Sequence, residues 1–179
     1  MSSLLDERIL IPKHISKYGC YSSVCMAVAG AIAIAYRFYV AGALVLAQAM
    51  LSYLNWYEVK RFSVIKVMDA MLAVLILTRI TFVDSTRFPA KQQRIWITAL
   101  VIILCTFVIN EALLYYQVKA RVFDSDPDAH RAPIYFSLTY TRTGTHEREY
   151  AYYRSTITHI AFIHLMPIIV LVYCIYMSS

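Results

Sequence analysis

Five side chains that could take part in chemistry lie inside otherwise apolar stretches of this chain. They are Ser52, Asp69, Glu111, His159 and His164. A carboxylate can act as a general base, a serine hydroxyl can stabilise a developing oxyanion, and neutral imidazole is a common metal ligand. An ionisable group in hydrocarbon costs free energy unless it is paired or hydrated. These residues therefore indicate either a buried polar network or a water-filled pocket.

The five residues fall in one half of a membrane when the apolar runs are drawn as an alternating helix bundle. Ser52 lies near the end of the second run, Asp69 two turns into the third, and Glu111 near the end of the fourth. His159 and His164 lie early in the last run. The sequence predicts a polar cluster there, with Asp69, Ser52 and Glu111 as candidate catalytic residues.

A structural role for the same residues is an open alternative. Lys66 stands three residues before Asp69, a spacing at which two side chains on a helix can pair. Asn110 stands beside Glu111, and such polar groups also hold transmembrane helices together by hydrogen bonds. On this interpretation, the polar residues stabilise the bundle and bind nothing.

The two histidines are the candidate metal ligands. Five residues separate them, which places them about 140° apart on a regular helix. One metal ion cannot comfortably take both from such a helix. Pro167, however, cannot donate to the carbonyl of Ile163 and favours a kink or a wide turn. A wide turn could bring His159 and His164 together, so zinc is the one cofactor that the sequence leaves open.

Ser52, Asp69 and the two histidines resemble the serine, aspartate and histidines that seven-helix membrane hydrolases carry around zinc, a group that includes alkaline ceramidases and adiponectin receptors. The resemblance implies a zinc-bound water near Asp69 that attacks a lipid amide or ester. The chain departs from that pattern. Trp56 stands four residues after Ser52 in place of a histidine, the last histidines are five rather than four apart, and two helices are missing. Four residues do not identify the chain as a member.

The elements that must position these residues are transmembrane helices. Hydrophobic residues make up 60% of the chain, charged residues 16%, and the mean hydropathy is +0.56. A spanning helix needs about 20 apolar residues, and five runs reach or approach that length. The sequence therefore predicts an all-α, polytopic transmembrane bundle. Its five spans cover residues 18–35, 39–57, 63–83, 95–116 and 155–177.

The remaining segments set the expected topology. Residues 1–17 form a basic tail, and residues 117–154, with several Asp, Pro and Gly residues, form one long extramembrane loop. Most Lys and Arg residues flank one side of the five runs, and basic loops stay on the side of insertion. We expect the N-terminus on the cytosolic or matrix side and the C-terminus opposite. The compartment is left open.

Small residues on the first two predicted helices indicate close helix packing. On the first helix they recur every four residues, and the second helix offers a similar set. We expect these helices to pack against each other or against a partner subunit. The packing candidates are Ser23, Ala27, Ala31, Ala35, Gly42, Ala43 and Ala47.

Two classes of function fit this pattern. The formal charge of +6 is spread over membrane boundaries, so anionic lipid headgroups are a better partner than nucleic acid. The favoured hypothesis is a non-catalytic structural or accessory subunit that binds lipids and other membrane proteins, or itself. The alternative is a small metal-dependent lipid hydrolase, or an element of a proton or ion path, that uses the polar cluster.

Overall fold

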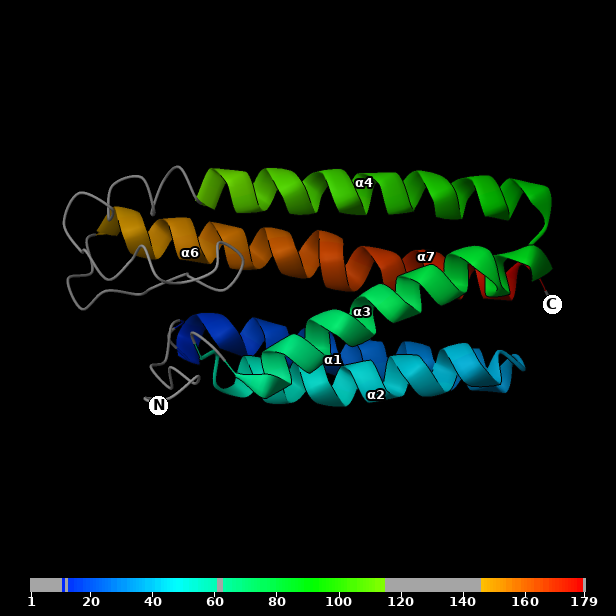
Figure 1. Cartoon of the computed structure of the whole chain (residues 1–179), viewed down its shortest axis with the longest axis horizontal. Helices are drawn as coiled ribbons and strands as arrows, with labels where there is room; N and C mark the ends of the chain where they lie inside the picture. The colour runs from blue at the N-terminus through cyan, green and yellow to red at the C-terminus, as the bar shows by residue number, and fades with distance from the viewer. Residues whose placement is uncertain (1–10, 12, 61–62, 115–145, 179) are drawn as a thin grey trace, which may run out of the picture.

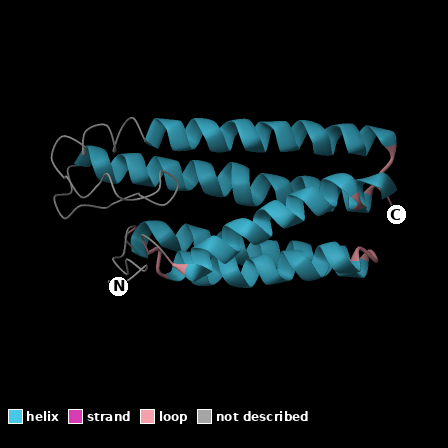
Figure 2. Cartoon of the chain, in the orientation of Figure 1, coloured by secondary structure: helices cyan, strands magenta, loops and turns pink. Residues whose placement is uncertain are grey.

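The computed structural model describes residues 11, 13–60, 63–114 and 146–178, which contain helices and no β-strand. The prediction of an all-α fold is confirmed for these residues (Figure 2). In chain order the elements are α1 (Lys13–Ala35), α2 (Tyr39–Tyr57), α3 (Val64–Phe82), the 3-10 turn η1 (Asp84–Arg87), α4 (Ala90–Leu114), α6 (His146–His159), the π-helical segment η5 (Ile160–Leu165) and α7 (Met166–Tyr176).

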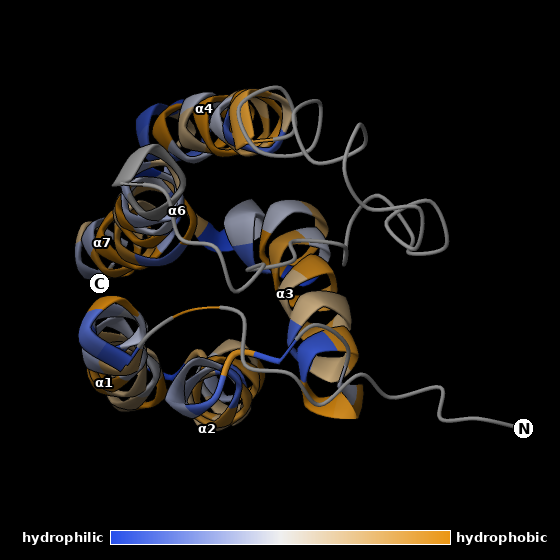
Figure 3. Ribbon diagram, turned by 90° about the vertical axis from the view of Figure 1, so that its left-hand side faces the viewer, coloured by the Kyte–Doolittle hydropathy of each residue, from blue (hydrophilic) through white to orange (hydrophobic). Residues whose placement is uncertain are grey.

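The long helices run side by side along the long axis of the molecule, and α3 crosses it obliquely (Figure 1). Their directions alternate along the chain, so α1 begins and α7 ends at opposite ends of the bundle. Viewed along the axis, α1 and α2 lie together, with α3 on one flank, α4 farthest from them, and α6 and α7 on the other flank (Figure 3). The last helix is continuous in space, because α6, η5 and α7 share one path.

Three of these helices are long and apolar enough to cross a membrane, which supports an integral membrane protein. They are Lys13–Ala35, Ala90–Leu114 and Tyr150–Tyr176. The predicted bundle of five spans is not confirmed. Helices α2 and α3 have 19 residues each, which gives about 28 Å at 1.5 Å per residue, close to the 30 Å hydrocarbon core. Helix α2 carries Gln48 and Asn55, and α3 carries three charged side chains, Lys66, Asp69 and Arg79.

The helix bounds differ from the predicted spans mainly at the helix starts. The first helix begins at Lys13, the fourth at Ala90 and the last at His146. Segment 146–154, which belongs to the predicted loop, is therefore helical. The rest of the predicted loop, residues 117–145, lies outside the described residues. Hydropathy marks where a helix leaves the hydrocarbon, but a segment without Pro or Gly continues as a helix beyond that point.

Helices α1 and α2 form the tightest pair in the bundle, and two glycines let them meet. Gly30 and Gly42 are both buried. A Cβ atom on Gly42 would lie 2.7 Å from the carbonyl oxygen of Gly30 and 2.9 Å from the backbone nitrogen of Ile34. Both neighbours are backbone atoms, which cannot rotate away. The backbones are therefore in direct contact at this level of the bundle.

The predicted packing residues divide between this contact and the outer surface. Ser23 and Gly42 are buried and Ala27 is half-buried, whereas Ala31, Ala35, Ala43 and Ala47 are exposed. The buried face of α1 next to Gly30 is formed by Met26, Ala29 and Ala33. The helices thus meet on the glycine face, beside the alanine positions.

Residues of the loop that joins α3 to α4 hold the turn between α1 and α2 in place. Arg37 occupies the left-handed region, with φ of 64°. Arg87 donates from Nη1 to the carbonyl of Arg37 at 3.2 Å, and its guanidinium lies 3.7 Å from the centre of the Phe38 ring. Phe38 in turn packs on Phe88, with ring centroids 5.8 Å apart. These contacts hold the hairpin to the end of the bundle opposite the polar cluster.

Candidate functional site

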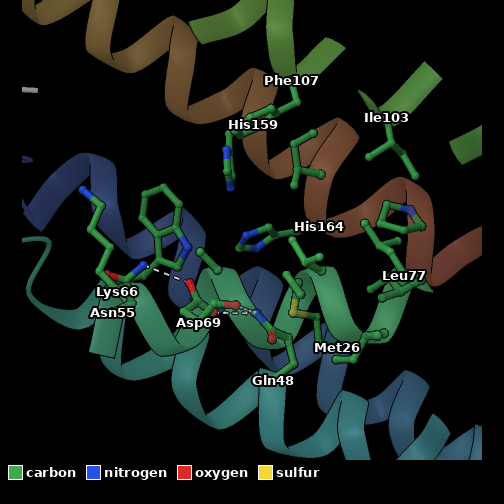
Figure 4. A pocket seen from close by; sticks show the side chains of 18 of the residues that line it. Met26, Gln48, Asn55, Lys66, Asp69, Leu77, Ile103, Phe107, His159 and His164 are labelled. Atoms are coloured by element: carbon green, nitrogen blue, oxygen red, sulfur yellow. Dashed lines mark hydrogen bonds between the residues drawn. The ribbon is translucent and has the colours of Figure 1, made fainter. Parts of the chain in front are cut away.

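A cavity of about 320 Å³ lies between the helices and is lined by residues of α1, α2, α3, α4 and the last helix. Its volume is at the lower end of the range of about 300–1,000 Å³ that is usual for small-molecule sites. One end carries polar side chains, several of which are labelled in Figure 4. Toward the other end the walls are apolar. The polar lining residues are Gln48, Asn55, Trp56, Lys66, Asp69, Glu111, Tyr152, Ser155, Thr156, His159 and His164, and the apolar end includes Ile76, Leu77, Ile80, Trp96, Ile103, Ile168 and Leu171.

The carboxylate of Asp69 is held by two side-chain amides from α2 (Figure 4). Gln48 donates from Nε2 to Oδ1 at 2.5 Å, and Asn55 donates from Nδ2 to Oδ2 at 3.0 Å. Gln48 and Asn55 are seven residues apart, which is two helical turns, so both lie on the face of α2 that meets α3. Hydrogen bonds to a charged acceptor are among the stronger ones in proteins. Both Asp69 oxygens are therefore fixed in place.

A π-helical turn brings the two histidines together. Segment Ile160–Leu165 is π-helical, and the backbone N–H of Met166 donates to the carbonyl of Ala161, five residues earlier. Pro167 follows directly and offers no N–H for a regular helical bond. The rings of His159 and His164 lie with their centroids 5.1 Å apart at an interplanar angle of 69°. The wide turn that Pro167 favours thus places both imidazoles at the cavity, as Figure 4 shows.

A serine on α1 sets the orientation of His164. The hydroxyl of Ser22 lies 2.7 Å from Nδ1 of His164 and donates to the carbonyl of Gly19 at 2.8 Å. A hydroxyl has one proton, so when that proton goes to Gly19, Nδ1 of His164 carries the hydrogen and donates to Ser22. Nε2 then has a free lone pair. In that arrangement His164 offers a hydrogen-bond acceptor, or a possible metal ligand, to its surroundings.

Trp56 forms an aromatic wall against both histidines. Its ring centroid is 5.8 Å from that of His159 and 5.9 Å from that of His164. Gly19 on α1 makes room for the indole, because a Cβ at that position would overlap the indole ring. The residue that stands where the zinc hydrolases have a histidine therefore packs on the histidines of this chain.

Several buried polar atoms at this end have no hydrogen-bond partner among the described residues. They are Gln48 Oε1, Asn55 Oδ1 and Trp56 Nε1. Ser52 is fully buried, and its hydroxyl lies within hydrogen-bonding reach of the Asp69 carboxylate. A buried polar atom without a partner is costly, about 1–3 kcal/mol each. Such atoms next to a cavity indicate that something polar fills it.

The charged side chains at the cavity come from two helices. Lys66 on α3 lies close enough to interact with Asp69 on its own helix and with Glu111 on α4. Next to Glu111, Asn110 donates from Nδ2 to the hydroxyl of Ser155 at 3.0 Å, which joins α4 to α6. Asn110 thus has a structural contact, while Glu111 faces the cavity.

The structure brings the sequence-predicted residues into one region. Asp69, Glu111, His159 and His164 line the cavity, and Ser52 lies beside Asp69. Gln48 and Ser22 are absent from the predicted set. The seven-residue spacing from Gln48 to Asn55 could have indicated Gln48, whereas nothing in the sequence links Ser22 to a histidine 142 residues away.

A metal site needs several ligand side chains close to one another. Within residues 11, 13–60, 63–114 and 146–178, no three His, Cys, Asp or Glu side chains are close enough to hold a metal ion. His159 and His164 could supply two nitrogen ligands, whereas catalytic zinc sites use three protein ligands. Zinc at this histidine pair stays a prediction, and so do catalytic roles for Asp69, Ser52 and Glu111.

Comparison with known proteins adds no analogue to this geometry. The function of the cavity has to be argued from its own residues. No protein-family model, no curated protein and no solved structure matches the chain.

Proposed function

We propose that this protein is a multi-pass membrane protein that binds a lipid inside its helix bundle. The observation that carries the proposal is the cavity with one polar end and one apolar end. A lipid has the same division, so its headgroup would lie at Asp69 and the histidines and its chain along Leu77 and Ile103. Buried polar atoms without partners at one end support an occupant that makes hydrogen bonds there.

The cavity reaches the outer surface of the bundle between α3 and α4. Val74 on α3 and Leu104 on α4 both line it, and both are more than half exposed, 66% and 52% respectively. In a membrane, such a rim faces lipid chains. A lipid could therefore enter sideways, without its apolar chain crossing water.

The proposal includes a topology. All five long helices cross the membrane, with the N-terminus on the cytosolic or matrix side and the C-terminus opposite. The alternating directions of the helices support this arrangement. The polar end of the cavity then lies in the half of the membrane nearer the N-terminus. Lys and Arg at the boundaries bind anionic headgroups on the surface, separately from the cavity.

Filling the cavity is the direct test. Ala73 lines it from α3, so Ala73→Phe is expected to lower the amount of lipid retained by the purified protein at least fivefold. Met71, two residues away and 68% exposed, gives the matched control Met71→Phe, which should retain lipid as the parent does. Native mass spectra of gently solubilised protein measure retained lipid, bound metal and protein partners together. Equal retention by Ala73→Phe and the parent would contradict the proposal.

The same spectra test whether the cluster also performs chemistry. In the hydrolase alternative, with or without zinc, a retained ester or amide lipid would be converted to its cleaved products on incubation. Asp69→Asn would then stop the conversion while lipid still bound. Intact lipid in both proteins after prolonged incubation would leave binding as the function of the site. A proton or ion path would need a polar route to the other end, where the described cavity walls are apolar.

A second candidate is a structural or accessory subunit of a membrane complex. Exposed small residues on the outer surfaces of α1 and α2 support it, because such positions allow another helix to approach closely. Ala31→Leu is then expected to detach a protein partner from the solubilised complex while lipid retention is unchanged. Retained assembly in that variant, measured in the same spectra, would count against the subunit role.

A further inference from the structure

The polar end of the cavity has unused acceptors as well as an unused donor, which restricts the headgroup that it can bind. Gln48 Oε1 and Asn55 Oδ1 have no partner among the described side chains and backbone, since the amide nitrogens of both residues are spent on Asp69. Nε2 of His164 is a third acceptor when Nδ1 carries the hydrogen toward Ser22. Among the described residues, the indole N–H of Trp56, which is only 7% exposed, is a buried donor without a partner.

A headgroup must therefore donate several hydrogen bonds and accept at least one. A carboxylate only accepts, and a phosphate diester also only accepts. An ammonium only donates and brings a charge. Hydroxyl groups do both, and two neighbouring hydroxyls can serve two of the acceptors while an oxygen accepts from Trp56. The hydrogen-bond pattern fits an uncharged polyol headgroup.

The charges around the cavity argue against an anionic headgroup. Among the described lining residues, the carboxyl groups of Asp69 and Glu111 lie at the polar end, and both are close to the ammonium of Lys66. The described part of the lining holds no arginine, which is the usual partner of carboxylate and phosphate groups. Both oxygens of Asp69 are already engaged by amides, so a cationic headgroup would have to displace them. A neutral headgroup meets neither problem.

The apolar part is suited to one chain. A cavity of about 320 Å³ is small for a ligand site, and its walls beyond the histidines include Leu77, Ile103 and Trp96. Two acyl chains would need more room than this volume gives. Trp96 is fully buried, and its Nε1 donates to Thr81 at 3.0 Å, so it contributes only apolar surface to the cavity.

We propose that the cavity takes a neutral, single-chain lipid with a diol headgroup, of which a monoacylglycerol is the simplest form. This inference rests on the proposed lipid-binding function and names the class of lipid. The diol lies against Gln48, Asn55, Trp56 and His164, and the chain extends toward Trp96.

Trp56 and Tyr53, which lie three residues apart on α2 and face the cavity and the outer surface respectively, provide a matched pair for the test. Full-length protein in detergent is exposed to an equimolar mixture of 1-monooleoylglycerol, oleate and oleoyl-lysophosphatidate, and retained lipid is read from native mass spectra. The expected result is at least a tenfold preference for monooleoylglycerol. Trp56→Phe should reduce the amount of monooleoylglycerol retained roughly threefold to tenfold, the effect of one hydrogen bond. Tyr53→Phe, on the exposed side of α2 and outside the cavity, should leave that amount unchanged.

The outcomes separate the two proposals. Preferential retention of oleate or lysophosphatidate, or retention of monooleoylglycerol that Trp56→Phe does not alter, overturns the diol headgroup and leaves lipid binding intact. Retention of none of the three lipids by a folded parent protein, with no lipid carried from its own membrane, overturns the proposed function itself. Thermal unfolding of both variants, followed by circular dichroism, confirms that each lipid measurement is made on folded protein.

Discussion

Gly42→Ala is expected to lower the free energy of unfolding by about 2–3 kcal/mol, the upper part of the range for overpacking a close contact. The added methyl would lie 2.7 Å from the Gly30 carbonyl oxygen and 2.9 Å from the Ile34 nitrogen. Because these are backbone atoms, the helices must separate to admit it. Separation of α1 from α2 removes close contacts along the whole pair, as there is no strong hydrophobic force to hold helices together in lipid.

Unfolding of Gly42→Ala in a mixed-detergent titration measures this effect. The adjacent residue gives the control, since Ala43 is exposed and Ala43→Val adds more bulk to the outer surface. That control should change stability by no more than about 0.5 kcal/mol. If both variants unfold at the same detergent composition as the parent, the close approach of the two helices at Gly30 and Gly42 is wrong.

Asp69→Leu is the second change with a large expected effect, and it separates structure from binding. The leucine side chain offers no acceptor, so Asn55 loses its partner and Gln48 keeps only the backbone carbonyl of residue 69. Each buried donor left without a partner costs about 1–3 kcal/mol. The same titration should show that stability falls by about 1–3 kcal/mol for each amide that water does not hydrogen-bond. Asp69→Asn keeps one acceptor oxygen and should lose less.

Replacing the amides as well then tests what the cluster is for. In a variant with Gln48→Leu, Asn55→Leu and Asp69→Leu, neither amide is left without an acceptor and Lys66 keeps Glu111 as its charge partner, so stability should return toward that of the parent. Lipid retention should not return, because the acceptors for the headgroup are gone. A stable triple variant that still retains lipid as the parent does would show that the amides and Asp69 serve structure alone.

The sequence predicts the position of the polar cluster along the bundle better than its internal contacts. Helices that alternate in direction place Asp69, Glu111 and His159 at similar depths whatever their rotation. The contacts that depend on how each helix is rotated about its axis are harder to predict. Gln48 meets Asp69 because one particular face of α2 packs on α3. Packing against Gly30 and its neighbours decides which face that is, and no single-sequence pattern contains it.

The π-helical turn could be anticipated only in part. Pro167 explains why a regular hydrogen bond fails beside His164, and the sequence therefore indicates a wide turn. The closure of His159 on His164 depends in addition on Trp56 and Ser22, which come from two other helices. Likewise, hydropathy indicates that α2 and α3 could span the membrane but does not establish it, because α3 carries three charged side chains and α2 has polar side chains near its end.

The π-helical segment Ile160–Leu165 also fixes the phase of the last helix. A π-turn holds one residue more than an α-turn, so it acts as a one-residue insertion in a continuous helix. Loss of a single residue there would allow an unbroken α-helix. Its two halves would then be turned by about 100° relative to each other. Either the side of α6 that carries Ser155 or the side of α7 that carries Leu171 would leave the interior, so the length of this short segment is constrained as closely as its residues are.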